Sequence, residues 1–227
     1  EYKREMEIPQ SAQSIAEKLA LDEHSVELID TLQEYLNEQV QTDTYDFMAN
    51  KTLMKLYQFY PERSNENCIA LAVTKSMMAL PSTDLSVLLY LVPETLALKE
   101  PIHTLVRCAD HLETARFVEF WEVANLGGNE LLDAIPGFPE AIRSFMIGVL
   151  SMTFQKLQSE TFLDLLMLDE ESLEEFIAEQ TDKLCLEEKK FVIFLPNSEN
   201  QSRPKKFKEN ISFDHMLPII NLLSRNT

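Results

Sequence analysis

The chain has 227 residues and a formal net charge of −18, from 20 Lys and Arg against 38 Asp and Glu. This length suits one large domain or two small ones, with a core that needs no disulfides. Because Lys and Arg contacts to phosphate dominate nucleic-acid affinity, so acidic a chain is a poor autonomous binder of DNA or RNA, and an anionic membrane would repel it. Other proteins are therefore more suitable partners for this chain than nucleic acids or membranes.

The cysteines favour a reducing compartment. Cys68, Cys108 and Cys185 are odd in number and far apart, which is untypical of a disulfide framework. No apolar run approaches the roughly 20 residues that a membrane span needs. The first ten residues are polar and do not form a secretion signal. The sequence therefore predicts a cytoplasmic protein without a membrane contact.

Amphipathic helices are predicted from about residue 11 to residue 126, where apolar side chains recur every three or four positions. Ser64 and Thr83-Asp84 are expected to cap helices. Helix pairs stacked in a row would form a HEAT-like helical repeat; a plain bundle is the alternative, since no strict repeat period is visible. Three stripes are clearest: Leu28, Ile29, Leu32, Tyr35, Leu36 and Val40 in the first; Tyr45, Met48, Ala49, Thr52, Leu53, Leu56, Tyr57 and Tyr60 in the second; and Ile69, Ala72, Val73, Ser76 and Leu80 in the third. The predicted breaks between helices are at Pro61, Pro81, Pro93 and Pro101.

A domain boundary is predicted at Gly127-Gly128, the one double glycine of the chain. It would divide a helical-repeat domain, 1–128, from a winged-helix domain, 129–227. A long helix should begin after Pro136-Gly137. Two short helices should follow, with a turn near 168–171. Ser172 and Glu175 have the spacing of a capping box for the second of them.

A short β-hairpin is predicted after these helices. The run 191–195 is β-branched and aromatic, and the run 211–213 is short enough to pair back onto it. Helix, helix-turn-helix and hairpin follow one another in the order of a winged helix, with 197–210 as the wing. Asp214 would cap a last helix that carries Met216, Ile219, Ile220 and Leu223. Alternation alone does not decide whether Phe191 and Ile193, or Val192 and Phe194, face outward.

The charges of the winged helix argue against autonomous DNA binding. Its second helix, which reads the major groove in DNA-binding relatives of this fold, should present Glu174, Glu175, Glu179 and Asp182, with only Lys183 to offset them. Two interpretations of the basic wing remain: a solvated loop, or a contact to an acidic neighbour or to ribosomal RNA inside a larger assembly. Its cations are Arg203, Lys205, Lys206 and Lys208.

Catalytic and cofactor motifs are weak. With four glycines the chain has no nucleotide-binding glycine loop, no nucleophile elbow and no HExxH zinc motif. Cys108 and His111 share a helix face, but a zinc site needs three or four ligands. Trp121 with its neighbouring phenylalanines is more typical of a core than of a pocket. We therefore expect no enzyme activity, no catalytic residue, no cofactor and no metal.

The chain resembles the K-subunit family of eukaryotic translation initiation factor 3 from about Asp30 to Leu223. The first 20 or so residues, the double glycine and the basic wing depart from the family pattern. The residues that carry the resemblance as a set are Tyr45-Asp46, Ala49-Asn50, Leu56-Tyr57-Gln58-Phe59, Pro61, Leu80-Pro81, Thr83-Asp84, Pro101-Ile102, Leu112-Glu113-Thr114, Phe117, Phe120, Trp121, Gly137-Phe138 and Phe213-Asp214.

The resemblance implies a PCI-type arrangement, helical repeat followed by winged helix, as in small subunits of the proteasome lid and the signalosome. It implies a non-catalytic scaffold subunit of initiation factor 3, with the L subunit as neighbour, that works in 43S pre-initiation complex assembly on the small ribosomal subunit. Proteasome-lid, signalosome and nucleic-acid-binding functions are the alternatives. We expect partner contacts at the hairpin, through Phe191, Val192, Ile193, Phe194, Leu195, Ile211 and Phe213.

Overall fold

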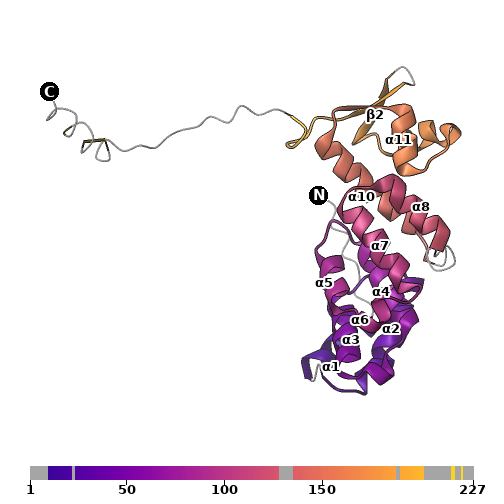
Figure 1. Ribbon diagram of the computed structural model, residues 1–227, viewed down its shortest axis with the longest axis vertical. Helices are drawn as coiled ribbons and strands as arrows, with labels where there is room; N and C mark the ends of the chain where they lie inside the picture. The colour runs from indigo at the N-terminus through magenta and orange to yellow at the C-terminus, as the bar shows by residue number, and fades with distance from the viewer. Residues whose placement is uncertain are drawn as a thin grey trace.

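The computed structural model describes residues 10–21, 24–127, 135–187 and 190–201, together with positions 216, 217 and 221. Helices α1 to α7 gather at one end of the molecule, the sheet lies at the other end, and α8 and α10 connect the two (Figure 1). The described chain is mostly helical, with a three-stranded sheet near its C-terminal side. The predicted fold class, a helical domain of PCI type that ends in a winged helix, is confirmed.

The helical end is built of helix pairs. Helix α2 packs on α3, α3 and α4 pack on α5, and α4 packs on α7. The predicted breaks at proline are confirmed, because no helix continues through any of the four. The bounds are α1 Gln10–Leu21, α2 Leu28–Gln41, α3 Phe47–Phe59, the 3-10 turn η1 Pro61–Arg63, α4 Glu66–Met78, α5 Asp84–Leu91, α6 Glu94–Ala97, α7 Ile102–Glu113 and α8 Phe117–Gly127.

Two of the predicted caps are wrong. Asn65, not Ser64, caps α4: its side-chain oxygen accepts the backbone N–H of Asn67 at 3.0 Å and of Cys68 at 3.4 Å. The Ser64 hydroxyl instead donates to the carbonyl of Pro61 at 2.6 Å, because η1 turns the chain back toward it. Thr83 precedes α5 but makes no side-chain cap bond.

Several polar side chains inside the helical end are paired. Gln39 and Asn50, both buried, exchange two amide hydrogen bonds of 3.0 and 3.1 Å between α2 and α3. The Gln39 side-chain oxygen also accepts the backbone N–H of Asp46 at 2.9 Å. The ammonium of Lys75, whose side chain is 3% exposed, lies 2.9 Å from a carboxylate oxygen of Asp43. These bonds fix how α2, α3 and α4 meet, since an unpaired buried polar group is costly.

Two apolar clusters run through the molecule and share helices. One lies among α1 to α6 and reaches the first residue of α7; the other extends from α4 and α7 through α8 and α10 to the sheet. Helix α4 contributes Ile69 and Ala72 to the first cluster, and Val73 and Met77 to the second. Helix α8 packs on α7 and also on α11 of the winged helix. The domain boundary at residue 128 stays a prediction.

The winged helix begins with the predicted long helix. Gly137 is the residue before its first turn and has a φ of 75°, a left-handed conformation that glycine adopts without strain. The two predicted short helices are also confirmed, with a 3-10 turn between them. The elements are α10 Phe138–Thr153, β1 Lys156–Gln158, α11 Ser159–Leu166, η2 Glu170–Ser172, α12 Leu173–Glu179, β2 Leu184–Glu187 and β3 Phe191–Phe194.

The predicted hairpin partner is wrong. Strand β3 is the central strand of an antiparallel sheet in the order β1-β3-β2, so both of its hydrogen-bonding edges are already filled. The hairpin joins β2 to β3 through the short connection at 188–190, and the segment 197–210 is not its loop. The residues Ile211 and Phe213 and the wing cations Arg203, Lys205, Lys206 and Lys208 lie outside the described residues. The predicted last helix is described only at Met216, Leu217 and Asn221.

Candidate subunit interface on the winged helix

Helix α11 of the winged helix is fixed to α8 and α10 by side chains that bind its last carbonyls. The indole N–H of Trp121 donates to the Leu165 carbonyl at 3.1 Å. The Arg143 side chain donates to the Leu166 carbonyl at 3.1 Å and lies 5.5 Å from the Trp121 ring centre. These carbonyls have no partner within the helix, and a cation is favoured at that end. The prediction that Trp121 is a core residue is confirmed.

The inner face of the sheet belongs to the core. Val192 is 0% exposed and Phe194 is 2% exposed. The Phe194 ring lies 6.3 Å from that of Phe162 on α11, centre to centre. The register places Leu184 and Leu186 of β2 beside Phe194 and Val192. Of the two alternatives for β3, the structure therefore turns Phe191 and Ile193 outward, and Val192 and Phe194 offer a partner no surface.

The outer face combines an ion pair with apolar side chains. Phe191 lies between Gln158 and Glu187 in the register. The ammonium of Lys156 pairs with Glu187 across the sheet and lies 4.1 Å from the Phe191 ring centre, which shields that ring. Ile193 is half-buried, and Leu195 just beyond β3 is 39% exposed. Ile193 and Leu195 are thus the predicted contact residues that remain open to a partner on this face.

The edges of the sheet are β1 and β2 among the described residues. The sequence analysis missed both strands. Strand β1 has only three residues, two of them exposed polar side chains, and β2 carries a cysteine and a glutamate on its outer face. Runs so short lack the β-branched and aromatic content that marks a strand. A sheet edge presents backbone N–H and C=O groups that a partner strand can bind.

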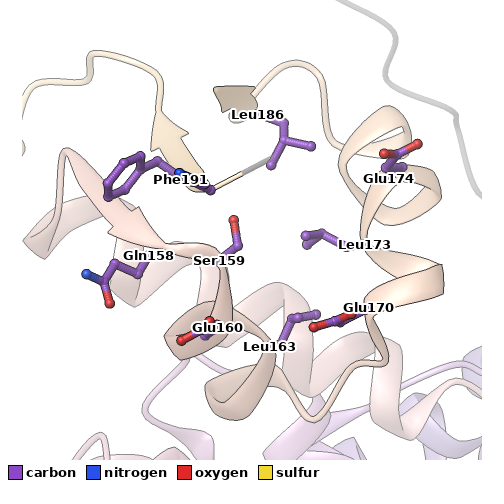
Figure 2. A pocket seen from close by; sticks show the side chains of 10 residues that line it. Gln158, Ser159, Glu160, Leu163, Glu170, Leu173, Glu174, Leu186 and Phe191 are labelled. Carbon is purple, nitrogen blue, oxygen red and sulfur yellow. The ribbon is translucent and has the colours of Figure 1, made fainter. Parts of the chain in front are cut away.

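A pocket of about 500 Å³ opens where α11, α12 and the β2–β3 hairpin meet. Figure 2 shows Leu163, Leu173 and Leu186 directed toward its interior and the Ser159 hydroxyl between them, whereas the Phe191 ring is directed away. Ser159 is 7% exposed, and its hydroxyl has no hydrogen-bond partner among the residues that the structure describes. The remaining lining residues are Gln158, Glu160, Glu170, Glu174 and Lys190.

The second helix of the helix-turn-helix, α12, presents negative charge, as predicted. Glu174, Glu175 and Glu179 on α12 are all exposed, and its seven residues include no Lys or Arg. The predicted capping box at its start is wrong: the Ser172 backbone is already helical, with φ −87° and ψ −9°, and its hydroxyl donates to the Asp169 carbonyl at 2.9 Å. A phosphate backbone would meet carboxylates on this helix.

Cys108 and His111 do not form part of a larger ligand set in the described chain. Among the residues described, no group of three or more His, Cys, Asp and Glu side chains is placed to hold a metal ion. Cys108 is 1% exposed, and burial raises the pKa of its thiol to about 12, although nearby Arg107 opposes the shift. A buried thiol of this kind is a core group rather than a nucleophile. No helix within the described ranges is long and apolar enough to cross a membrane.

The comparisons with known proteins agree with the fold. A sequence model of the CSN8/PSMD8/EIF3K family matches residues 63–206. Similar curated proteins bear the name eukaryotic translation initiation factor 3 subunit K. The Dictyostelium discoideum protein is 35% identical over 152 residues, which is 67% of this chain and 61% of that protein, less than two thirds of its length. The Bombyx mori protein is 30% identical over 86% of this chain and 88% of its own length, and the Xenopus tropicalis protein is 28% identical over 88% and 90%.

Proposed function

The chain belongs to the CSN8/PSMD8/EIF3K family, and from this membership we propose that it is a non-catalytic scaffold subunit of eukaryotic translation initiation factor 3. It would act through protein–protein contacts in 43S pre-initiation complex assembly on the small ribosomal subunit, in the cytoplasm. The observation that carries the proposal is the alignment with K subunits along most of the chain. The proposed direct neighbour is the L subunit of the same factor.

The outer sheet face is the proposed contact surface. Ile193 and Leu195 offer apolar area at the sheet, and β1 and β2 offer backbone edges to a partner strand. The Lys156–Glu187 ion pair beside them gives the surface a polar margin. An apolar centre with a polar rim is the usual anatomy of a protein interface.

The test is co-purification of factor 3 subunits with a tagged chain that carries Ile193→Glu and Leu195→Glu. Two buried charges at an interface centre should reduce recovery of the L subunit at least about tenfold. Leu98→Glu is the matched control, because Leu98 is 78% exposed and directly follows α6 in the helical end. Circular dichroism of both variants checks that the fold is intact. Undiminished recovery with the double variant would reject this surface.

A proteasome-lid or signalosome subunit is the second candidate, because the name of the matched family includes proteins of both complexes. The similar K subunits favour initiation factor 3 over them. Nucleic-acid binding by the isolated chain is disfavoured by the exposed glutamates of α12. Salt-sensitive RNA or DNA binding by the purified chain would revive that alternative.

A further inference from the structure

The pocket beside α11 has an apolar interior and a buried hydroxyl without a partner. Leu163 and Leu173 are 8% and 6% exposed, and with Leu186 they lie on the side of the pocket that faces Ser159 (Figure 2). A volume of about 500 Å³ lies within the range of roughly 300–1,000 Å³ that is typical of ligand pockets. Most buried hydroxyls in proteins are hydrogen-bonded, so an unpartnered Ser159 hydroxyl that faces a pocket indicates a missing polar partner.

The backbone at the start of α11 adds donors to this site. The Ser159 N–H is used, since it donates to the Lys190 carbonyl at 2.9 Å. Gln158 precedes the helix and makes no side-chain cap bond. The first N–H groups of a helix have no partner within it, so the second and third amides of α11 can bind an acceptor such as a peptide carbonyl.

The rim of the pocket selects for positive charge. Among the described residues that line the pocket, Glu160, Glu170 and Glu174 carry carboxylates and Lys190 carries the one ammonium. A phosphate group or an acidic peptide would meet net repulsion there. A Lys or Arg side chain can place its aliphatic stem on leucine and its charged head beside carboxylates.

From these features we propose that the pocket binds a short segment of a partner protein in which leucine-like and basic residues alternate. The apolar side chain contacts Leu163, Leu173 and Leu186, a basic side chain lies beside Glu170 and Glu174, and the peptide backbone bonds the Ser159 hydroxyl. This site lies apart from the apolar face of Ile193 and Leu195. It does not rest on the proposed function, because its ligand is defined by chemistry alone.

The test uses the purified full chain and a fluorescent acetyl-Gly-Leu-Arg-Leu-Arg-Gly-amide peptide, with a matched peptide that carries Glu in place of Arg. Fluorescence anisotropy measures binding. Glu170→Lys with Glu174→Lys should weaken binding of the Arg peptide about tenfold or more. Glu171→Lys with Glu175→Lys is the control: it changes the net charge equally on the same two elements, but its residues do not line the pocket. Ser159→Ala should weaken binding about three- to tenfold.

Three results would overturn the inference. They are the absence of saturable binding up to about 1 mM peptide, equal losses in the two double variants, and equal binding of the Glu peptide. Ser159→Ala removes one hydroxyl without adding volume, so it keeps the test valid if a charge variant fails to fold. Peptide binding that follows the expected order, in a chain that recovers no factor 3 subunit, would support the pocket and reject the proposed function.

Discussion

The two ends of the molecule differ in what their buried polar groups face. In the helical end, Gln39 and Asn50 satisfy each other, and the nearly buried Lys75 has Asp43 as its partner. In the winged helix, the hydroxyl of Ser159 is buried beside a pocket without a partner. Paired polar groups rigidify a core, whereas unpaired groups beside a pocket are available to a ligand. His111 Nδ1 on α7 is also buried without a hydrogen-bond partner among the described residues, so what distinguishes the winged helix is that its unpaired hydroxyl lines a pocket.

The two ends also differ in how many backbone hydrogen-bonding groups they leave open to a partner. The helices of the helical end satisfy their internal backbone groups within themselves. The small sheet leaves the outer edges of β1 and β2 open among the described residues. Yet the two ends share one apolar cluster through α4, α7, α8 and α10, so they are expected to unfold together.

The largest expected effect is in the core that joins the two ends. Phe162 is 0% exposed and lies 6.3 to 6.5 Å, centre to centre, from the rings of Phe194 and Phe176. Phe162→Ala should lower the free energy of unfolding by about 3–5 kcal/mol through lost contacts and the cavity left behind. Urea unfolding should still show one transition. A winged helix that melts first while α2–α5 stay folded would break the link between the ends.

The next effect concerns the paired amides of the helical end. Asn50→Ala leaves the Gln39 amide N–H without its partner and should cost about 1–3 kcal/mol of stability. Adding Gln39→Ala should cost less than the sum of the two single variants, because both partners of the bond are then absent. Chemical unfolding of the three variants measures the coupling. Strictly additive losses would contradict the role given to the pair.

The buried ammonium of Lys75 provides a further test of how the helical end pairs its buried polar groups. Asp43→Asn removes the charge partner while tolerating the positive φ of 50° at that position, and should cost about 1–2 kcal/mol, reduced by the exposure of Asp43 to water. Lys75→Met removes the buried charge itself and should cost less. Thermal unfolding of the two variants gives the order. The reverse order would contradict this account, because both variants remove the ion pair and only Asp43→Asn leaves a buried charge without it.

The smallest effect is a dependence of stability on alkaline pH. Burial raises the pKa of Cys108 from 9.0 to about 12, and burial together with Asp46 raises the pKa of Tyr35 from 10.0 to about 12. Folding thus favours the protonated forms. Their contribution is complete below about pH 9 and is lost as pH rises toward 12, because the unfolded chain ionises first. Urea midpoints at several pH values should fall across this window. Cys108→Ala and Tyr35→Phe should flatten the decline.

Local features of the fold could be predicted from the sequence, and long-range ones could not. The stripes of α2, α3 and α4 and the long helix α10 follow a period that neighbouring residues specify. Strand β3 was also correctly placed, from its β-branched and aromatic run. Its partners were not, because Lys156–Gln158 and Leu184–Glu187 carry little strand signal, and α11 and α12 separate β1 from β3 in the sequence.

The candidate site was predicted only in part. The sequence indicated the strand that carries Ile193 and Leu195, but not which face they occupy, since alternation gives two equal answers until the register is known. The pocket was missed entirely. Ser159, Leu173 and Leu186 come from three elements, and only the tertiary packing of α11, α12 and β2 places them together. The two serine caps failed for a local reason: at Ser64 and at Ser172 a 3-10 turn used the hydroxyl, whereas Thr83 makes no side-chain cap bond.

The measurement that most directly tests the account is a gentle pull-down of the tagged full chain from cell extract, washed with rising salt and analysed by mass spectrometry. We expect initiation factor 3 subunits to be recovered, with the L subunit retained to the highest salt concentration. Recovery of proteasome-lid or signalosome subunits in their place, or of no multi-subunit complex, would contradict the proposal that this chain is a scaffold subunit of initiation factor 3.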